Sequence, residues 1–130
     1  STGLLRSPMT ISDSTIVTIS ASNHPPVHFG ASVPIDFSPI TITRSVLKST
    51  ATTGTGDGLS FTGAVTDSKV TLTDVVVTAM NTGINFDTGP VTRSDVAIDN
   101  ATVTSGAGWV VVTGHADSEY TAVKLVCRTP

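Results

Sequence analysis

The stretch Gly58-Leu-Ser-Phe-Thr-Gly63, followed by Asp67-Ser68-Lys-Val70-Thr-Leu72, decides the fold because its pattern recurs twice further along the chain. A second copy opens with Gly83-Ile-Asn-Phe86-Asp-Thr-Gly89, and a third opens with Gly108-Trp-Val-Val111-Val-Thr-Gly114. The opening glycines lie 25 residues apart (83 − 58 = 25 and 108 − 83 = 25). A fixed period of this length is typical of proteins built from stacked, similar coils.

Each copy has the pattern of short strands. Apolar and polar residues alternate, as in Val70-Thr-Leu72, and the branched residues Val, Ile and Thr are frequent. A single coil cannot bury its apolar residues, so successive copies are expected to stack in parallel. The expected columns place Leu59 over Ile84 over Trp109, and Phe61 over Phe86 over Val111. The predicted core contains Leu59, Phe61, Val70, Leu72, Val75, Val77, Ile84, Phe86, Val96, Ile98, Val103 and Leu125.

We therefore expect an all-β protein, a single-stranded right-handed parallel β-helix of about five coils with a 25-residue period. The whole chain, 1–130, is expected to form one domain. Residues 1–30 would form an irregular first coil, and residues 31–130 the regular coils. Within the first coil, Asn23-His-Pro-Pro-Val-His-Phe-Gly30 is predicted to project as a loop, because its paired prolines remove two backbone donors.

The strand threonines are expected to stack in outward columns. Val17-Thr-Ile19 and Ile40-Thr-Ile42 align with Val70-Thr-Leu72. One column would hold Thr18, Thr41, Thr71 and Thr121, and Thr43 and Thr73 would begin another. Ala97 and Asp99 interrupt these rows, so ordinary β-propensity accounts for the threonines.

Composition excludes several classes of function. Charged residues make up 13% of the chain, the net charge is −3, and lysines and arginines are scattered, so no basic stripe for nucleic acid is present. The longest apolar runs are too short for a transmembrane helix. A mean hydropathy of +0.24 with so few charges indicates that something other than water covers part of the surface, which favours an assembly. The one cysteine, Cys127, aligns with core positions and is expected to be a small buried residue.

Two phrases resemble a known superfamily. Gly56-Asp-Gly-Leu-Ser-Phe61 and Asn81-Thr-Gly-Ile-Asn-Phe86 are similar to the turn-then-strand units of pectate-lyase-like right-handed β-helices. That superfamily includes phage tailspikes and other virion proteins, surface adhesins and polysaccharide-degrading enzymes. The resemblance covers about residues 31–130 and implies the fold, whereas the same fold carries unrelated activities.

The catalytic motifs of the enzymes in this superfamily are incomplete here. The resemblance would imply an acidic cluster, a Gly-His-Gly and an Arg-x-Lys, but Gly114-His115 is followed by Ala116 and no Arg-x-Lys occurs. The acid pairs that stacking could bring together are Asp67 with Asp95 and Asp87 with Asp99. We expect these aspartates to lie at turns and on outward faces, and we expect no catalytic residues.

No metal site or cofactor is expected either. His24 and His28 could bind a metal across a symmetric trimer, but their spacing is not diagnostic and a third ligand is lacking. We interpret both as exposed loop residues.

The last copy replaces polar residues with apolar ones. Asn85, Asp87, Asp99 and Thr102 of the preceding copy align with valines. We predict an assembly interface made of Trp109, Val110, Val112, Val123 and Val126. The alternative is that the inward and outward positions of this copy are misaligned by one residue.

These patterns favour a non-enzymatic structural or attachment protein of a virion, such as a phage capsid decoration, head-fibre or tail-fibre module. Its location would be the virion surface or extracellular space. The expected partners are further copies of the chain, as a homotrimer by resemblance to virion β-helices, and other virion proteins, with no nucleic acid and no membrane. The alternatives are a polysaccharide-acting β-helix enzyme, a lyase or hydrolase, and a sugar-binding adhesin module.

Overall fold

The computed structural model describes residues 4–19, 24–30, 34–50, 56–86, 89–106, 111–112 and 119–126. All regular structure in these ranges is β-strand, and every strand pair is parallel. Within the same ranges, no helix is long and apolar enough to cross a membrane. The expectation of an all-β fold with parallel strands is confirmed.

The strands form three parallel sheets, named here A, B and C. Sheet A contains β1 (Leu4–Leu5), β2 (Met9–Ser12), β5 (Ile35–Asp36), β6 (Ile40–Thr43), β9 (Val65–Thr66), β10 (Lys69–Thr73), β13 (Val91–Asp99) and β16 (Glu119–Val126). Sheet B contains β3 (Thr15–Thr18), β7 (Val46–Ser49), β11 (Val76–Ala79) and β14 (Thr102–Ser105). Sheet C contains β4 (Val27–Phe29), β8 (Leu59–Phe61), β12 (Ile84–Asn85) and β15 (Val111–Val112).

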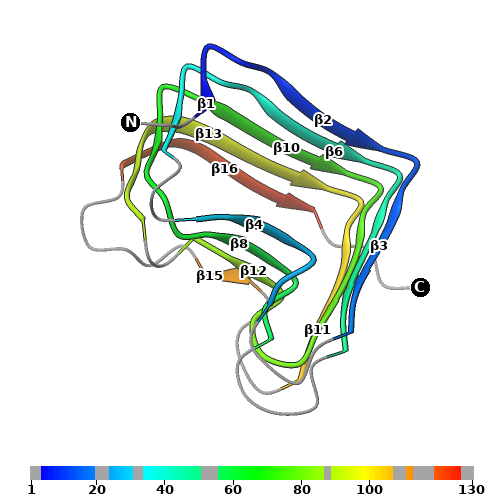
Figure 1. The fold of residues 1–130 in the computed structure, drawn as a ribbon. Coiled ribbons are helices and arrows are strands. Elements are labelled where there is room, and N and C mark those ends of the chain that lie inside the picture. Colours follow the sequence, from blue (N-terminus) through cyan, green and yellow to red (C-terminus); the bar gives the residue numbers. More distant parts are fainter. Residues whose placement is uncertain are drawn as a thin grey trace.

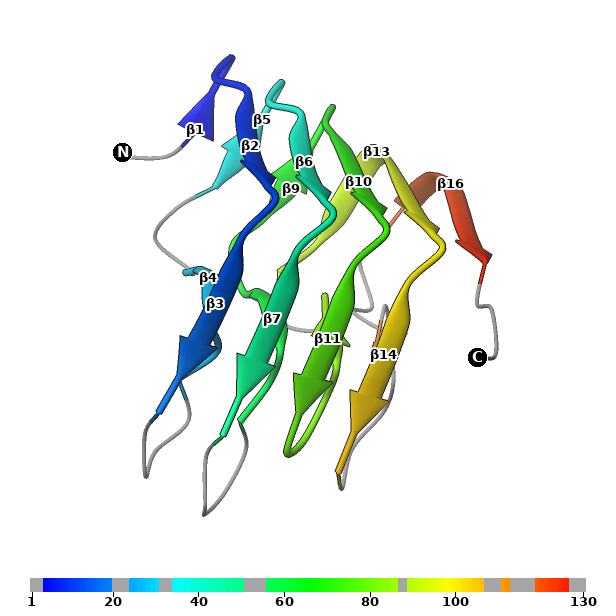
Figure 2. The same cartoon turned by 90° about the vertical axis from the view of Figure 1, so that its right-hand side faces the viewer.

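The chain visits these sheets in a repeating order, A then B then C, and returns to A (Figure 1). Successive strands of sheet B lie side by side with the strands of sheet A above them, as Figure 2 shows. This curled arrangement of parallel strands is compatible with a β-helix or another solenoid.

The spacing between stacked residues varies along the chain. In sheet A, Met9, Ile40, Val70, Val96 and Val123 form one column, with steps of 31, 30, 26 and 27 residues (40 − 9, 70 − 40, 96 − 70 and 123 − 96). The predicted 25-residue period holds between β8 and β12 (84 − 59 = 25), but the step from β4 to β8 has 32 residues (59 − 27) and the step from β12 to β15 has 27 (111 − 84). Segments between strands can change in length without shifting the register of the strands themselves, which is why a fixed period fails.

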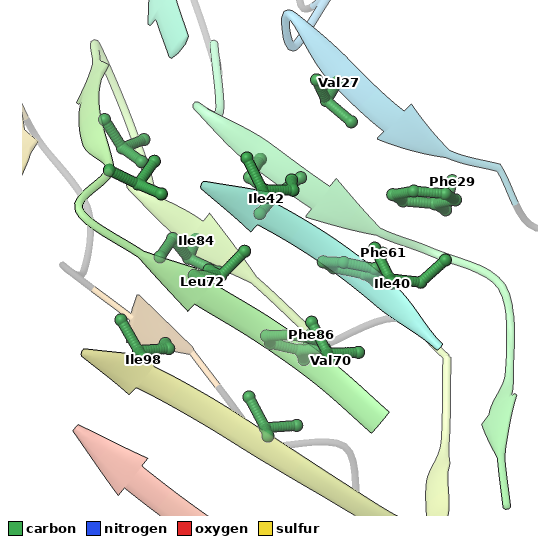
Figure 3. Packing of buried hydrophobic residues seen from close by; sticks show 14 of the residues in the cluster. Val27, Phe29, Ile40, Ile42, Phe61, Val70, Leu72, Ile84, Phe86 and Ile98 are labelled. Carbon is green, nitrogen blue, oxygen red and sulfur yellow. The ribbon is translucent and has the colours of Figure 1, made fainter. Parts of the chain in front are cut away.

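The hydrophobic core lies between the sheets, where isoleucines of β6 face aromatic residues of β4 and β8 (Figure 3). The predicted core is confirmed for Leu59, Phe61, Val70, Leu72, Val75, Val77, Ile84, Phe86, Val96 and Ile98, which are all buried. Val103 is only partly buried. Leu125 lies opposite Ile98 in the register, a core position, although its own side chain is outside the described part.

A stack of three phenylalanine rings runs through the core on sheet C. The ring centroids of Phe29 and Phe61 are 4.7 Å apart, and those of Phe61 and Phe86 are 4.4 Å apart, with nearly parallel planes. The predicted continuation of this column to Val111 is wrong, because Val111 pairs with Ile84. Trp109, predicted to stack on Ile84, lies outside the described residues.

The prediction of a projecting loop at residues 23–30 is also wrong in part. Val27 to Phe29 form β4, which pairs with β8, and both Val27 and Phe29 are buried. The prolines precede this strand instead of interrupting it, so they remove no hydrogen bond from the ladder between β4 and β8.

The expected alignment of Val17-Thr-Ile19 with β6 is wrong as well. The register pairs Thr10 with Thr41 and Thr41 with Thr71, whereas Thr18 lies in sheet B opposite Ser49. Val17 and Ile19 are exposed, and the apolar residues of the first turn that pack against the core include Met9 and Ile11. Alternation alone did not distinguish β2 from β3, since both strands carry threonine beside branched apolar residues.

Phe86→Ala should lower the free energy of unfolding by about 3 to 5 kcal/mol, because it removes a fully buried ring from the stack. Urea denaturation followed by circular dichroism measures this loss. Val76→Ala, at a half-exposed position of sheet B, is the control and should have little effect. A loss below about 1 kcal/mol for Phe86→Ala would contradict the packing described here.

Gly58→Ala should destabilise the protein by about 1 to 3 kcal/mol through overpacking. A Cβ at this position would lie 2.3 Å from Val77 Cγ1 and 2.7 Å from the Gly83 carbonyl oxygen. Gly30→Ala is the matched control, since nothing lies within 4 Å of a Cβ there. Equal unfolding midpoints for the two variants in urea would show that successive turns do not approach closely at Gly58.

Candidate functional site

The corners of sheet A carry two columns of residues with left-handed backbone conformation. All the described non-glycine residues with positive φ fall in these columns, with φ between 45° and 54°. The first column consists of Arg6, Phe37, Asp67 and Arg93. The second consists of Asp13, Arg44, Asp74 and Asn100. Most side chains resist this conformation, so each corner is a strained position that the surrounding ladder holds in place.

A serine follows each residue of the first column, and its hydrogen bonds stabilise the backbone at the corner. The Ser7 N–H donates to Ser38 Oγ, the Ser38 N–H to Ser68 Oγ and the Ser68 N–H to Ser94 Oγ, each at 3.0 Å. Each hydroxyl also donates to the carbonyl two residues earlier, at 2.7 to 2.9 Å. The hydroxyls of Ser38, Ser68 and Ser94 therefore each bridge their own turn and the preceding one, which stabilises the sharp bend.

A shallow, open hollow of about 380 Å³ lies beside the first column. It is lined by Asp67, Ser68, Lys69, Arg93 and Asp95. Arg93 donates from Nε to Asp67 Oδ1 at 2.7 Å and from Nη2 to Asp67 Oδ2 at 2.5 Å, a two-point ion pair. Lys69 lies opposite Asp95 in the register between β10 and β13. The hollow thus combines two carboxylates with two cations.

The Arg93 guanidinium determines the ionisation of Asp67. Its hydrogen bonds are the main reason that the pKa of the Asp67 carboxyl is lowered; desolvation acts in the opposite direction, and the charge of Arg93 adds a smaller lowering. Asp67 is therefore an ionised acceptor at neutral pH. A general acid needs the opposite shift, so Asp67 is not suited to protonate a leaving group.

The second column lies where the chain passes from sheet A to sheet B, and it contains an ion pair of the same kind. Arg44 donates from Nε and Nη2 to the two carboxylate oxygens of Asp13, each at 2.6 Å. These bonds are the largest cause of a lowered pKa for Asp13. One turn further on, Asn100 Nδ2 donates to Asp74 Oδ1. Complementary side chains thus link successive turns at both corners.

A nearly buried carboxylate, Asp57, joins two turns at the entrance to sheet C. It is 7% exposed. Its Oδ1 accepts from Asn81 Nδ2 at 3.1 Å and from the Thr82 N–H at 3.3 Å, and its Oδ2 accepts from Asn85 Nδ2 at 2.9 Å. Three donors satisfy the carboxylate, so it acts as a clamp between turns. The sequence patterns did not identify this carboxylate. A signal was present, because Asp57 and Asn81 lie about one turn apart in the two similar segments Gly56–Phe61 and Asn81–Phe86.

The structure brings together one of the two predicted acid pairs. Asp67 and Asp95 line the same hollow. Asp99 lies opposite Thr73 in the register, while its predicted partner Asp87 is outside the described residues, as is His115.

The histidines of the first turn are exposed, as expected. His28 Nε2 lies 2.9 Å from Thr62 Oγ1, so its ring is engaged with the following turn. Among the residues that the structure describes, no group of three or more His, Cys, Asp or Glu could hold a metal ion.

The predicted interface falls largely on parts that the structure does not describe. Trp109 and Val110 are outside the described residues. Val112 lies opposite Asn85, Val123 opposite Val96 and Val126 opposite Asp99. The sequence pattern aligned Val112 with Asp87, Val123 with Asp99 and Val126 with Thr102, and the register shows that these three alignments are wrong. The pairing is irregular between Thr92 and Asp95, but from Asp95 onward each residue of β13 lies opposite the residue 27 positions later (122 − 95 = 27), so a 25-residue period does not give these partners. The interface itself stays a prediction.

Comparison with known proteins found no relative of this chain. No protein-family model, no curated protein and no solved structure matches the chain.

Stability should fall in acid because of the two Asp–Arg pairs. The pKa of Asp13 and of Asp67 is lowered in the folded state, so the contribution of each pair is complete above the unfolded pKa of about 4. It is lost as the pH falls through the lower, folded value. The melting temperature, measured from pH 7 to pH 2, should decrease below about pH 4.

Replacing both acids, as Asp13→Asn with Asp67→Asn, should lower the melting temperature at pH 7 and reduce the further loss in acid. Asp99→Asn is the control, since it removes an acid outside both pairs. A parent protein whose melting temperature stays constant down to pH 2 would contradict this assignment.

Proposed function

We propose that the chain is a non-enzymatic structural or attachment protein that works within a larger assembly. The observation that carries the proposal is the charge pairing in the hollow at the first corner. Arg93 binds the Asp67 carboxylate at two points, and Lys69 lies opposite Asp95. The two-point ion pair stabilises the stack of turns, and it makes Asp67 unsuited to be the protonated carboxyl that glycoside hydrolysis requires.

The finer description of the fold belongs to the same proposal. The chain is a single-stranded right-handed parallel β-helix of about five coils, related to the pectate-lyase-like superfamily. The cyclic order of the sheets and the parallel register support this description. The resemblance of Gly56–Phe61 and Asn81–Phe86 to turns of that superfamily supports a place in a virion, as a capsid decoration or a fibre module.

The surface composition also favours an assembly. Only 13% of the residues are charged, about half the usual share for a soluble domain. Exposed apolar side chains in the described part include Leu5, Val17, Ile19 and Val76. Packing against further copies or against other virion proteins would cover such residues.

The enzyme alternative has one observation in its favour, the Asp67 and Asp95 carboxylates in a single hollow. Incubating the purified protein with a panel of bacterial capsular polysaccharides, followed by an assay for new reducing ends and unsaturated products, tests it. We expect no cleavage. Cleavage by the parent that disappears in Asp67→Asn/Asp95→Asn, with circular dichroism unchanged, would replace the structural proposal with the enzyme. Cleavage retained in that variant would also refute the proposal and would place the catalytic residues elsewhere.

A further inference from the structure

One end of the stack presents unpaired strand edges. β2, β3 and β4 each stand last in their sheets among the described strands. The Met9 N–H donates to the Pro39 carbonyl and the Asp13 N–H to the Thr43 carbonyl, so alternate residues of β2 face β6. The N–H and C=O of Thr10 and Ser12 therefore point away from β6, towards the open edge. Such an edge is a template for another strand.

The same end leaves apolar residues half covered. Leu4, Met9, Ile11 and Ile16 are only partly buried, although they pack against the core. Their partners one turn further on, Ile35, Ile40, Ile42 and Leu47, are each 0% exposed. The residues of the two turns are of similar types. They differ in burial because the second turn has a described turn on each side and the first turn has one on only one side. A layer seated on this end would bury four more apolar side chains.

We propose that this layer is a second copy of the chain, paired through β2 across a two-fold axis. Antiparallel pairing with Thr10 opposite Thr10 of the partner subunit would use the open N–H and C=O groups of both copies. It also places Met9 opposite Ile11 of the partner subunit, on the core side of the sheet. The inference rests on the proposed function, since it names the partner of a protein that works in an assembly.

Charges at the two ends of β2 match this symmetry. Arg6 precedes β2 and Asp13 follows it, and both are exposed. A two-fold axis at Thr10 would bring Arg6 of each copy close to Asp13 of the partner subunit. Within one copy, Asp13 already binds Arg44, and Arg6 lies over the Phe37 ring at 5.7 Å. The Arg6–Asp13 contacts between the two copies would therefore extend the columns of oppositely charged side chains at both corners of sheet A from one copy into the next.

The shape of the two ends favours this arrangement over head-to-tail stacking. At the β2 end, the last described strands of the three sheets belong to the same turn. At the opposite end, sheet A continues to β16, whereas sheets B and C stop at β14 and β15 in the described part. Two β2 ends can meet across their whole surfaces, because all three sheets reach the same turn there. If the β16 end met a β2 end instead, β16 would cover β2, but no described strand would cover β3 and β4. Two identical surfaces related by a two-fold axis are also the commonest form of self-association.

Sedimentation equilibrium of the parent protein should give twice the chain mass of 13.3 kDa. A mass of one chain up to high protein concentration would overturn the dimer, and so would a defined trimer. A mass that grows without limit as concentration rises would indicate head-to-tail stacking instead. Because none of these results concerns polysaccharide cleavage, the dimer can fail while the proposed structural function stands.

Cysteine cross-linking tests the register directly. In a Cys127→Ser background, Thr10→Cys would face Thr10→Cys of the other copy at about 5.5 Å between Cα atoms, within reach of a disulfide. We expect mild oxidation to convert most of this variant into a covalent dimer. Thr41→Cys is the matched control, in the same outward column but inside the sheet, and should stay monomeric on a denaturing gel. Equal cross-linking of the two variants would overturn the proposed pairing.

Discussion

The parallel hydrogen-bond ladder between successive turns is the constraint on which the rest of the structure depends. It fixes which residue lies above which, so Phe29, Phe61 and Phe86 stack their rings and the inward-facing valines and isoleucines form continuous columns. Adjacent strands in such a ladder are about 4.8 Å apart, a distance that suits parallel aromatic rings. The hydrophobic core and the charged corners are both consequences of this spacing.

The ladder also explains why polar chemistry gathers at the corners. Where the chain bends sharply within sheet A, Asp67, Arg93 and their counterparts adopt left-handed conformations, and so do the residues at the bend from sheet A to sheet B. Stacking then places these side chains over one another, and opposite charges stabilise the stack where like charges would oppose it. Serine hydroxyls and the Asp57 carboxylate perform the same task for backbone N–H groups.

Alternation and repetition were enough to predict the strands and core of the central turns. Leu59, Val70 and Ile84 were assigned correctly, because a buried strand position must be apolar and its neighbours need not be. The same reasoning failed at Val17 and for β4. In the first turn the intervals between strands are longer, and no other described strand covers one side of it, so burial no longer separates inward from outward positions as sharply.

The sequence by itself determined that the chain is all-β, that its strands stack in parallel, and which apolar residues form the core of the central turns. Those properties follow from local patterns that each turn repeats. Only the tertiary structure decided that Asp67 meets Arg93, that Asp57 clamps the following turn, and that Val123 lies opposite Val96. These contacts join residues about one turn apart, and the number of residues in a turn changes along the chain. Because a shift of one residue moves a side chain to the other face of a sheet, such partners follow from the register alone.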